Sequence, residues 1–347
     1  MAGLGTAVPP LRISQADSLA FILANFRIRE GTKSLYRRVM SHPGVAFRHV
    51  ALAEPAEIME TDLDRIHARF QRWAVTLGAE ALTRALAAAG KTPEELGFLA
   101  TTTCTGTLCP GLSSYLAESC GLARGLAAVD LVGMGCGAAL PALRQADSWV
   151  RTHPQGTAAV VAAEICTAAM FDGDSADLVI SNSIFGDGAA AAVVGAPAAG
   201  RVSPRLVDFA SATYPEWRES LRFRTEGGRL RNVLARDVPA RAGEAVPALV
   251  RELLGRHSLA PDGVGHWLLH PGGANVLDAA RDGLGVPEER LAASRRILRD
   301  YGNMSSPSCL FVLQEEIATS PPRAGELGVL AAFGAGFSVH AALVRFE

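Results

Sequence analysis

The chain has 347 residues, of which 49% are hydrophobic and 20% are charged, and its formal net charge is -2. These values predict an ordered globular protein with roughly two domains or one duplicated fold. Because lysine and arginine form no long run, nothing in the charge pattern indicates a nucleic-acid partner. The most apolar stretch, Ala158 to Met170, contains Glu164 and is too short to span a membrane, and the first residues lack the features of a signal peptide. We therefore expect a cytoplasmic protein without a membrane partner.

Hydrophobic periodicity predicts alternating helices and strands along the first half of the chain. The helical pattern is clearest where Phe70, Ala74, Leu77 and Ala81 recur at intervals of three and four residues. A short helical turn is expected to begin at Thr92. Longer helices are expected over 15–41, 61–90 and 112–120, and strands over 98–102, 129–135 and 158–163. This alternation favours an α/β sheet covered by helices.

Two Phe-Gly-x-Gly segments, at 185–188 and 333–336, each lead into an apolar run. Their similarity indicates an internal repeat. The segment 196–245 is rich in Arg, Pro and Gly, so we expect it to hold the boundary between the halves and loops over the site. The predicted halves are residues 1–205 and 206–347.

Cys136 stands where an apolar run ends and a helical pattern begins, and glycines occupy positions 133, 135 and 137. A thiol at a helix N-terminus is near the positive end of the macrodipole, which favours the thiolate. The sequence therefore makes Cys136 a candidate nucleophile. A small buried core cysteine has the same local pattern, so the local sequence leaves both interpretations open.

The other cysteines give no sign of a metal or redox site. The six cysteines form no Cys-x-x-Cys pair and lack zinc-type spacing to histidine. Free thiols are expected in a reducing compartment.

Two later segments carry further candidates. His270 ends an apolar strand before a Pro-Gly-Gly turn, so its imidazole is placed to reach a cleft. Asn303 precedes a serine-rich helix start and offers a neutral amide donor for a developing oxyanion. A core or capping histidine and an N-cap asparagine are the structural alternatives. We expect His266 on the opposite face of the strand, in a structural role.

As a set, these segments resemble the signature segments of type III polyketide synthases, the chalcone synthase family. They occur in the family's order at 135–136, 185–188, 270–273, 301–306 and 333–336. Residues 132–136 and 298–303 are most similar to the bacterial branch that includes dihydroxyphenylacetyl-CoA synthase. The resemblance implies a thiolase-like duplicated α/β fold, with two related halves packed as a layered αβαβα core. The N-terminal half would carry the cysteine, and the C-terminal half the histidine and the asparagine.

The resemblance also implies a mechanism. Cys136 would carry the starter acyl group and then the growing chain as a thioester. His270 would support the thiolate and, with Asn303, bind the thioester carbonyl of malonyl-CoA while CO2 leaves. The resulting enolate would attack the acyl group, and cyclisation would give an aromatic or pyrone product. Phe185 would be a gate between the CoA tunnel and the inner cavity, with a core phenylalanine as the alternative.

Several positions depart from the plant members of the family. Asn232 stands where plant enzymes have an aromatic gate, which implies a more polar entrance. Only Arg38 remains of the basic residues that hold the CoA phosphates, so either other arginines replace them or the acyl donor arrives on a carrier protein. Cys104 falls where the family lines its cavity, and Cys109 in a loop that reaches the partner subunit; a wall of the pocket is the favoured role for both. Ser305 is expected to contact the substrate.

Other classes of protein share some of these features. A thiolase needs a second cysteine in the final glycine-rich segment, and none follows Cys309. A ketoacyl-ACP synthase III or a ketosynthase that condenses carrier-bound chains would use the same three residues and stays open. A papain-like hydrolase fits poorly because of the repeated Phe-Gly-x-Gly elements, and a non-enzymatic binding protein fits poorly because all three candidate catalytic residues are present.

The resemblance further implies a homodimer that uses malonyl-CoA and an acyl-CoA starter, or an acyl carrier protein, without a metal or tightly bound cofactor. The starter, the number of extensions and the cyclisation depend on the shape of the cavity, which the sequence does not give.

Overall fold

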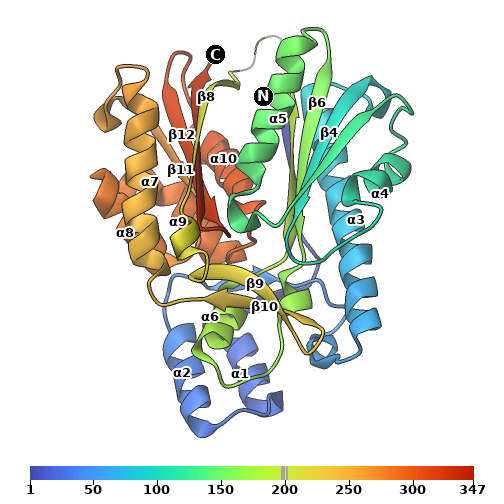
Figure 1. The fold of residues 1–347 in the computed structure, drawn as a ribbon, viewed down its shortest axis with the longest axis vertical. Coiled ribbons are helices and arrows are strands. Elements are labelled where there is room, and N and C mark those ends of the chain that lie inside the picture. Colours follow the sequence, from blue (N-terminus) through green and yellow to red (C-terminus); the bar gives the residue numbers. More distant parts are fainter. Residues whose placement is uncertain (197–199, 201) are drawn as a thin grey trace.

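The computed structural model describes residues 1–196, 200 and 202–347. Within them, each half of the chain contributes one large β-sheet (Figure 1). The strand order is β1-β7-β6-β4-β5 in the first sheet and β11-β12-β13-β8 in the second. The strands are β1 (Gly3–Ala7), β4 (Leu96–Thr103), β5 (Ala127–Val132), β6 (Thr157–Glu164), β7 (Gly188–Val194), β8 (Pro204–Thr213), β11 (His266–Leu269), β12 (Leu327–Gly334) and β13 (Ser338–Phe346).

The two sheets repeat one topology. In the first sheet, β7 pairs antiparallel with β1 and β6, and β6 pairs parallel with β4. In the second sheet, β13 pairs antiparallel with β8 and β12, and β12 pairs parallel with β11. The Phe-Gly-x-Gly segment at 185–188 ends on the first residue of β7, and the segment at 333–336 connects the end of β12 to the equivalent strand β13. The predicted duplication is therefore confirmed.

Helices separate and cover the sheets in the predicted αβαβα order (Figure 1). Helices α5 (Ala139–Thr152) and α10 (Ser308–Thr319) lie between the sheets. Helices α3 (Leu63–Ala89) and α4 (Leu112–Ser119) cover the first sheet, and α7 (Val238–Gly255) and α8 (Ala274–Leu284) cover the second. The buried residues of α3 include Phe70, Ala74, Leu77 and Ala81, as their spacing predicts. Strands β6 and β7 are buried along their whole length, which explains their uninterrupted apolar sequences.

The remaining elements gather at one end of the molecule and along the connections (Figure 1). They are β2 (Arg12–Ser14), α1 (Gln15–Asn25), α2 (Glu30–Met40), β3 (Phe47–His49), α6 (Ala176–Ile184), β9 (Leu221–Glu226), β10 (Arg229–Leu234), α9 (Ala292–Tyr301) and the 3-10 turns Pro55–Met59, Pro93–Glu95, Gly135–Gly137, Cys166–Ala169, Pro215–Trp217, Pro261–Gly263 and Glu288–Leu291.

Residues 15–41 do not form the single helix that was expected. Helix α1 ends at Asn25, Phe26 is extended, and α2 begins at Glu30. Asp174, distant in sequence, accepts hydrogen bonds from the Arg29 backbone N–H (2.9 Å) and the Thr32 hydroxyl (2.7 Å). A carboxylate at this point stabilises a helix N-terminus, so the new helix starts there.

Two further expectations need correction. The apolar run at 129–135 is not a buried strand: β5 ends at Val132, which is 65% exposed, and it forms the edge of its sheet. The segment 196–245 is more regular than expected, because it contains β8, β9, β10 and the start of α7. Residues 197–199 and 201 of this segment lie outside the described residues. No helix in the described part of the chain is both long and apolar enough to cross a membrane.

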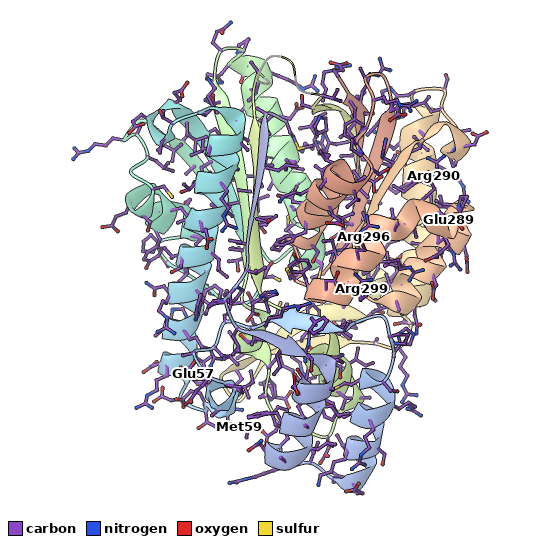
Figure 2. The ribbon with its side chains drawn as sticks, turned by 180° about the vertical axis from the view of Figure 1, so that it is seen from behind. Glu57, Met59, Glu289, Arg290, Arg296 and Arg299 are labelled. Carbon is purple, nitrogen blue, oxygen red and sulfur yellow. The ribbon has the colours of Figure 1, made fainter. Side chains whose placement is uncertain are left out.

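His266 has the structural role that was expected, but for a different reason. Its ring nitrogens hydrogen-bond to Glu316 (2.9 Å) and Glu326 (3.0 Å). Residues four apart share a face in a strand, so alternation alone would place His266 and His270 together. They separate because β11 ends at Leu269. His266 borders a cavity of about 520 Å³. Arg290 and Arg296, which Figure 2 labels, also line this cavity.

Replacing His266 with glutamine is expected to lower stability by about 1–2 kcal/mol at pH 6. Hydrogen bonds to Glu316 and Glu326 raise the pKa of His266 above 6.5. The stabilisation is therefore complete below pH 6.5 and is lost as pH rises through the raised folded pKa. Urea unfolding of both proteins at a series of pH values checks this; an equal difference in unfolding free energy at pH 6 and pH 9 would contradict it.

Candidate active site

Cys136 lies in the 3-10 turn Gly135–Gly137, between β5 and α5. The turn packs against the connection between β12 and β13 of the other half. A Cβ on Gly135, whose φ is +63°, would lie 2.9 Å from the Ala335 nitrogen, and one on Gly137 would lie 3.2 Å from the Phe333 carbonyl carbon. Glycine at both positions allows this approach. The turn that carries Cys136 in one half therefore packs directly against the Phe-Gly-x-Gly segment of the other half.

The surroundings of Cys136 do not favour the thiolate as its sequence position suggested. Burial raises the pKa of Cys136 to about 12, and the nearby polar side chains of Ser305 and Asn303 oppose only part of this shift. The regular helix α5 starts only at Ala139, so Cys136 is not in its first turn. Desolvation therefore exceeds the effect of the helix end. Burial therefore favours the neutral thiol of Cys136 over its thiolate.

Asn303 is held at both ends of its side chain. Its Nδ2 donates to the Gly272 carbonyl (3.2 Å), and its Oδ1 accepts from the Ser305 N–H (2.8 Å). Its backbone forms a parallel bridge with Phe185, in which the Asn303 N–H donates to the Ile184 carbonyl (2.8 Å). Ser305 has a φ of +59°, a conformation that is uncommon without such support. The amide is therefore rigidly oriented, and one Nδ2 hydrogen is left for a ligand.

His270 follows β11 and is buried, with both ring nitrogens unpaired among the described residues. It therefore makes no hydrogen bond to Cys136. Its ring stands edge-on to the ring of Phe333, with 5.7 Å between the ring centroids. Phe333 directly precedes Gly334, whose backbone lies against the Cys136 turn. Burial lowers the pKa of His270 to about 3. A buried neutral imidazole without a protein partner is suited to exchanging a proton with a ligand.

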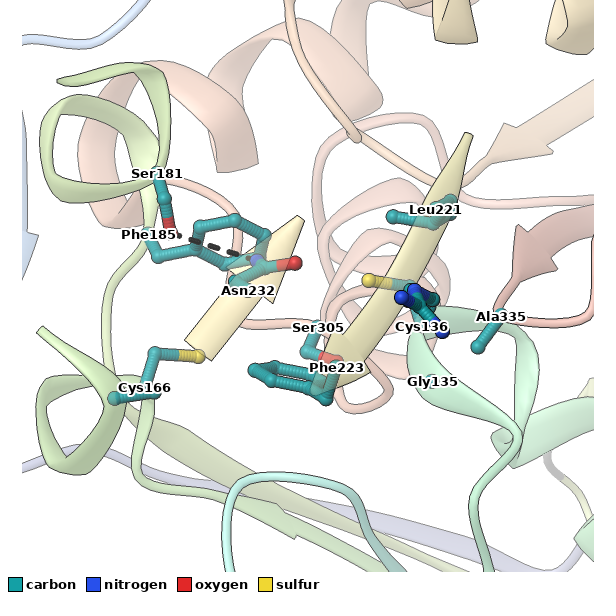
Figure 3. Close-up of a pocket in the computed structure, with 12 residues that line it drawn as sticks. Gly135, Cys136, Cys166, Ser181, Phe185, Leu221, Phe223, Asn232, Ser305 and Ala335 are labelled. Atoms are coloured by element: carbon teal, nitrogen blue, oxygen red, sulfur yellow. Dashed lines mark hydrogen bonds between the residues drawn. The ribbon is translucent and has the colours of Figure 1, made fainter. Parts of the chain in front are cut away.

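A small chamber of about 20 Å³ surrounds the sulfur (Figure 3). Phe185, Ser305 and Asn232, three of the substrate-binding residues predicted from the sequence, line it with Cys136. Asn232 donates to the Ser181 hydroxyl (3.4 Å), and its buried Oδ1 has no partner in the described part of the chain. The sequence did not reveal the other lining residues, which come mainly from the turn at 166–169 and the β9–β10 hairpin. They are Gly135, Cys166, Ala169, Ser181, Leu221, Arg222, Phe223 and Ala335.

Cys104 does not line the chamber but lies behind Ser305. Its Sγ is 3.3 Å from the Ser305 hydroxyl and 3.3 Å from a carboxylate oxygen of Glu164. Glu164 is fully buried and also accepts from the Thr105 hydroxyl (2.9 Å) and the Ser306 hydroxyl (2.6 Å). Burial raises the pKa of Glu164. The sequence signal was present: Glu164 is the one carboxylate in an otherwise apolar stretch, and it ends a buried strand.

Arg38 is distant from the chamber and lines a second cavity of about 420 Å³. Arg236 and His42 line it as well, and neither Arg38 nor Arg236 pairs with a carboxylate within the described ranges. At one end the cavity reaches Gly272, whose carbonyl accepts a hydrogen bond from Asn303. It also reaches Ile184 and Leu234, which pack against the hydrophobic cluster that contains Cys136 and Phe185. The lining residues nearest the site are therefore Ile184, Leu234, Gly272 and Gly273. The cavity therefore lies next to the cluster that contains Cys136, and it carries two arginines without a carboxylate partner among the described residues.

Comparison with known proteins identifies the family. Residues 7–207 match the profile of FAE1/type III polyketide synthase-like proteins, and residues 211–346 match that of the C-terminal domain of chalcone and stilbene synthases. The chain belongs to the type III polyketide synthase family. This synthase is 33% identical to the 1,3,6,8-tetrahydroxynaphthalene synthase of Streptomyces peucetius, over 100% of this chain and 93% of the relative. It is 35% identical to the 3,5-dihydroxyphenylacetyl-CoA synthase of Streptomyces toyocaensis, over 99% and 89%.

Solved structures confirm the fold of the synthase. The tetrahydroxynaphthalene synthase of Streptomyces coelicolor superimposes with a TM-score of 0.92 at 24% identity, covering 100% of this chain and 99% of that one. The thiolase-like fold and the resemblance to bacterial members, both expected from the sequence, are confirmed. The synthase is an enzyme of the acyltransferase kind that condenses acyl units.

Proposed function

We propose that this synthase holds an acyl starter on Cys136, extends it by decarboxylative condensation with malonyl-CoA, and cyclises the chain to an aromatic or pyrone product. One observation carries the proposal. The buried thiol of Cys136 shares a chamber with Ser305, to which Asn303 is hydrogen-bonded, and the unpaired imidazole of His270 packs on Phe333 beside the Cys136 turn, where the two halves meet. Family membership supports the reaction class, and the geometry supports the assignment of roles.

We assign the acyl transfer to Cys136 and His270. The sulfur attacks the carbonyl carbon of the starter thioester while the thiol proton passes to the imidazole. The carbon–sulfur bond to CoA then breaks, and the imidazole returns the proton to the departing CoA sulfur. Burial favours the neutral form of each group alone, but opposite charges stabilise each other when the proton moves between them. The proton transfer is therefore coupled to substrate binding.

Decarboxylation is assigned to Asn303 and His270. When the carboxylate of malonyl-CoA leaves as CO2, its electron pair moves onto the thioester carbonyl oxygen. The free Nδ2 hydrogen of Asn303 and an N–H of the neutral imidazole are the donors for that oxygen. The enolate carbon then bonds to the acyl carbon on Cys136, whose sulfur leaves, and the chain has grown by two carbons.

The cavity beside Arg38 is proposed as the CoA channel. The phosphates of CoA are anionic, and Arg38 and Arg236 are unpaired cations within the described residues on its wall. Arg236 would thus replace the basic residues that the sequence lacks. This supports a CoA thioester, rather than a carrier protein alone, as the acyl donor.

Replacing Arg236 with alanine is expected to raise the KM for malonyl-CoA about fivefold, with little change in kcat. The lost phosphate contact would stabilise the bound substrate and the transition state equally, so its loss weakens binding without slowing the reaction. Steady-state kinetics measure both constants. Arg229→Ala is the matched control, because Arg229 lies on the preceding strand β10 and faces Phe171 at another cavity. A KM equal to that of the wild type would contradict the assignment of the channel.

The function is tested by incubating the purified protein with labelled malonyl-CoA and a panel of acyl-CoA starters. Release of labelled CO2 and cyclic products of matching mass are expected. The same panel on an acyl carrier protein separates the two kinds of donor. Condensation with carrier-bound chains alone would overturn the proposal of a CoA-dependent synthase.

We further propose a cytoplasmic homodimer that works without a metal or organic cofactor. The edge strand β5 supports the dimer, because its exposed Val132 and free hydrogen-bonding edge suit pairing with a second copy. The six free cysteines support a reducing compartment. The assigned side chains provide the nucleophile, the proton carrier and the oxyanion donors. Sedimentation analysis checks the dimer, and assay in the presence of a chelator checks the independence from metals.

A further inference from the structure

Arg48, on β3, is a buried cation that the mechanism above does not use. It is 3% exposed, and its Nη1 donates to the carbonyls of Asn182 (2.6 Å) and Phe185 (3.0 Å). Helix α6 ends at Ile184, so these carbonyls belong to the helix end, where intrahelical donors are missing. A guanidinium there also lies at the negative end of the helix dipole. Arg48 therefore caps α6 from a distant part of the chain.

The aliphatic part of Arg48 is packed against the two turns that flank the Phe185–Asn303 bridge. A Cβ on Gly302 would lie 3.0 Å from Cγ of Arg48, and one on Gly186 would lie 3.6 Å from its Cβ. Gly302 has a φ of +72° and directly precedes Asn303. One side chain thus contacts the residue before the amide donor and the residue after the gate phenylalanine.

No carboxylate hydrogen-bonds to Arg48 within the described ranges, although Asp187 attracts it through space. Burial lowers the pKa of Arg48 to about 10, so the group stays cationic at neutral pH. Asp187 is itself committed to the Ala51 N–H (2.6 Å) and to the hydroxyl of Thr167 (2.7 Å). The guanidinium is therefore directed at the two carbonyls of the α6 end rather than at a salt bridge.

We propose that Arg48 is a positioning residue for decarboxylation, which fixes the ring of Phe185 and the amide of Asn303 in one geometry by joining the end of α6 to the Gly302 turn. The proposal rests on the role given above to Asn303. It concerns only the malonyl-CoA half-reaction, because Cys136 lies on the separate turn Gly135–Gly137.

Arg69 offers a matched control. It is also buried, and its guanidinium also donates to two carbonyls, those of Glu57 (2.7 Å) and Thr167 (3.2 Å). These carbonyls lie outside the Phe185–Asn303 bridge. Arg48→Lys and Arg69→Lys each remove a buried planar donor while keeping the charge.

The test measures three quantities in both variants: the melting temperature, the rate of CO2 release from malonyl-CoA, and the rate of Cys136 alkylation by iodoacetamide. We expect comparable losses of thermal stability in the two. CO2 release should fall about tenfold or more in Arg48→Lys alone, because small misplacements of catalytic groups have effects of this size. Cys136 alkylation should change less than twofold in either variant.

Equal losses of CO2 release in the two variants would overturn the proposal, as would a loss of Cys136 alkylation in parallel with CO2 release. If Arg48→Lys does not fold, Arg48→Gln, whose amide can still donate to one carbonyl, takes its place with Arg69→Gln as control. The wild-type rate is the reference. Absence of CO2 release from the wild type would instead count against the proposed function itself, so the two failures are distinguishable.

Discussion

Cys136→Ala is expected to abolish polyketide formation, with a decrease of about 10⁴-fold or more, because loss of a nucleophile removes the covalent intermediate. The fold should persist, since alanine fits the space of the buried thiol with a loss of about 1 kcal/mol. Release of CO2 from malonyl-CoA should continue, because the donors His270 and Asn303 are unchanged. Mass spectrometry of products and release of labelled CO2 measure the two activities separately.

Cys166→Ala is the matched control for this experiment. Cys166 is also buried and lines the same chamber as Cys136 (Figure 3). Burial raises the pKa of both thiols. Product formation should survive in the control to within a few fold. Unchanged polyketide yield in Cys136→Ala, or equal loss in both variants, would exclude Cys136 as the nucleophile.

Asn303→Ala is expected to slow decarboxylation of malonyl-CoA by about 10²–10³-fold, the usual effect of removing one oxyanion donor. The measurement is CO2 release in a Cys136→Ala background, where condensation does not remove the enolate. Acylation of Cys136 by a starter thioester, followed by intact-protein mass spectrometry in the otherwise native enzyme, should be affected less than decarboxylation.

Asn303→Asp distinguishes the role of Asn303 as a hydrogen-bond donor to the substrate from its role in supporting the Ser305 turn. The aspartate keeps an acceptor for the Ser305 N–H but has no hydrogen to give to a thioester oxygen or to the Gly272 carbonyl. Its decarboxylation rate should therefore fall as far as that of Asn303→Ala. A rate close to that of the native enzyme would show that Asn303 only supports the Ser305 turn.

Local sequence patterns predicted a helix or strand correctly where the residues of that element alone determine its structure. The spacing of Phe70, Ala74 and Leu77 predicts α3, and the uninterrupted apolar run at 158–163 predicts β6. These patterns gave wrong predictions where contacts with residues distant in sequence determine the structure. The break between α1 and α2 depends on Asp174, about 145 residues away, and neither glycine nor proline marks it. The exposure of β5 depends on its place at the edge of the sheet.

The same distinction holds for the site. Cys136, His270 and Asn303 could be found because each stands beside a turn that a short motif identifies. Glu164 and Arg48 could not be assigned roles, because their partners come from segments between about 60 and 142 residues away. The raised pKa of Cys136 also could not be foreseen, because it results from burial of the thiol in the folded chain.

The seating of the Cys136 turn on residues 333–335 has a consequence for how the two copies of the ancestral unit have diverged. Neither copy retains a complete active centre, because one supplies the sulfur and the other supplies the floor beneath it. Cleavage between the copies would remove this floor and would also expose the buried apolar layer to which α5 and β12 both contribute. The two copies share one strand topology, but they are no longer equivalent at the residues that surround Cys136.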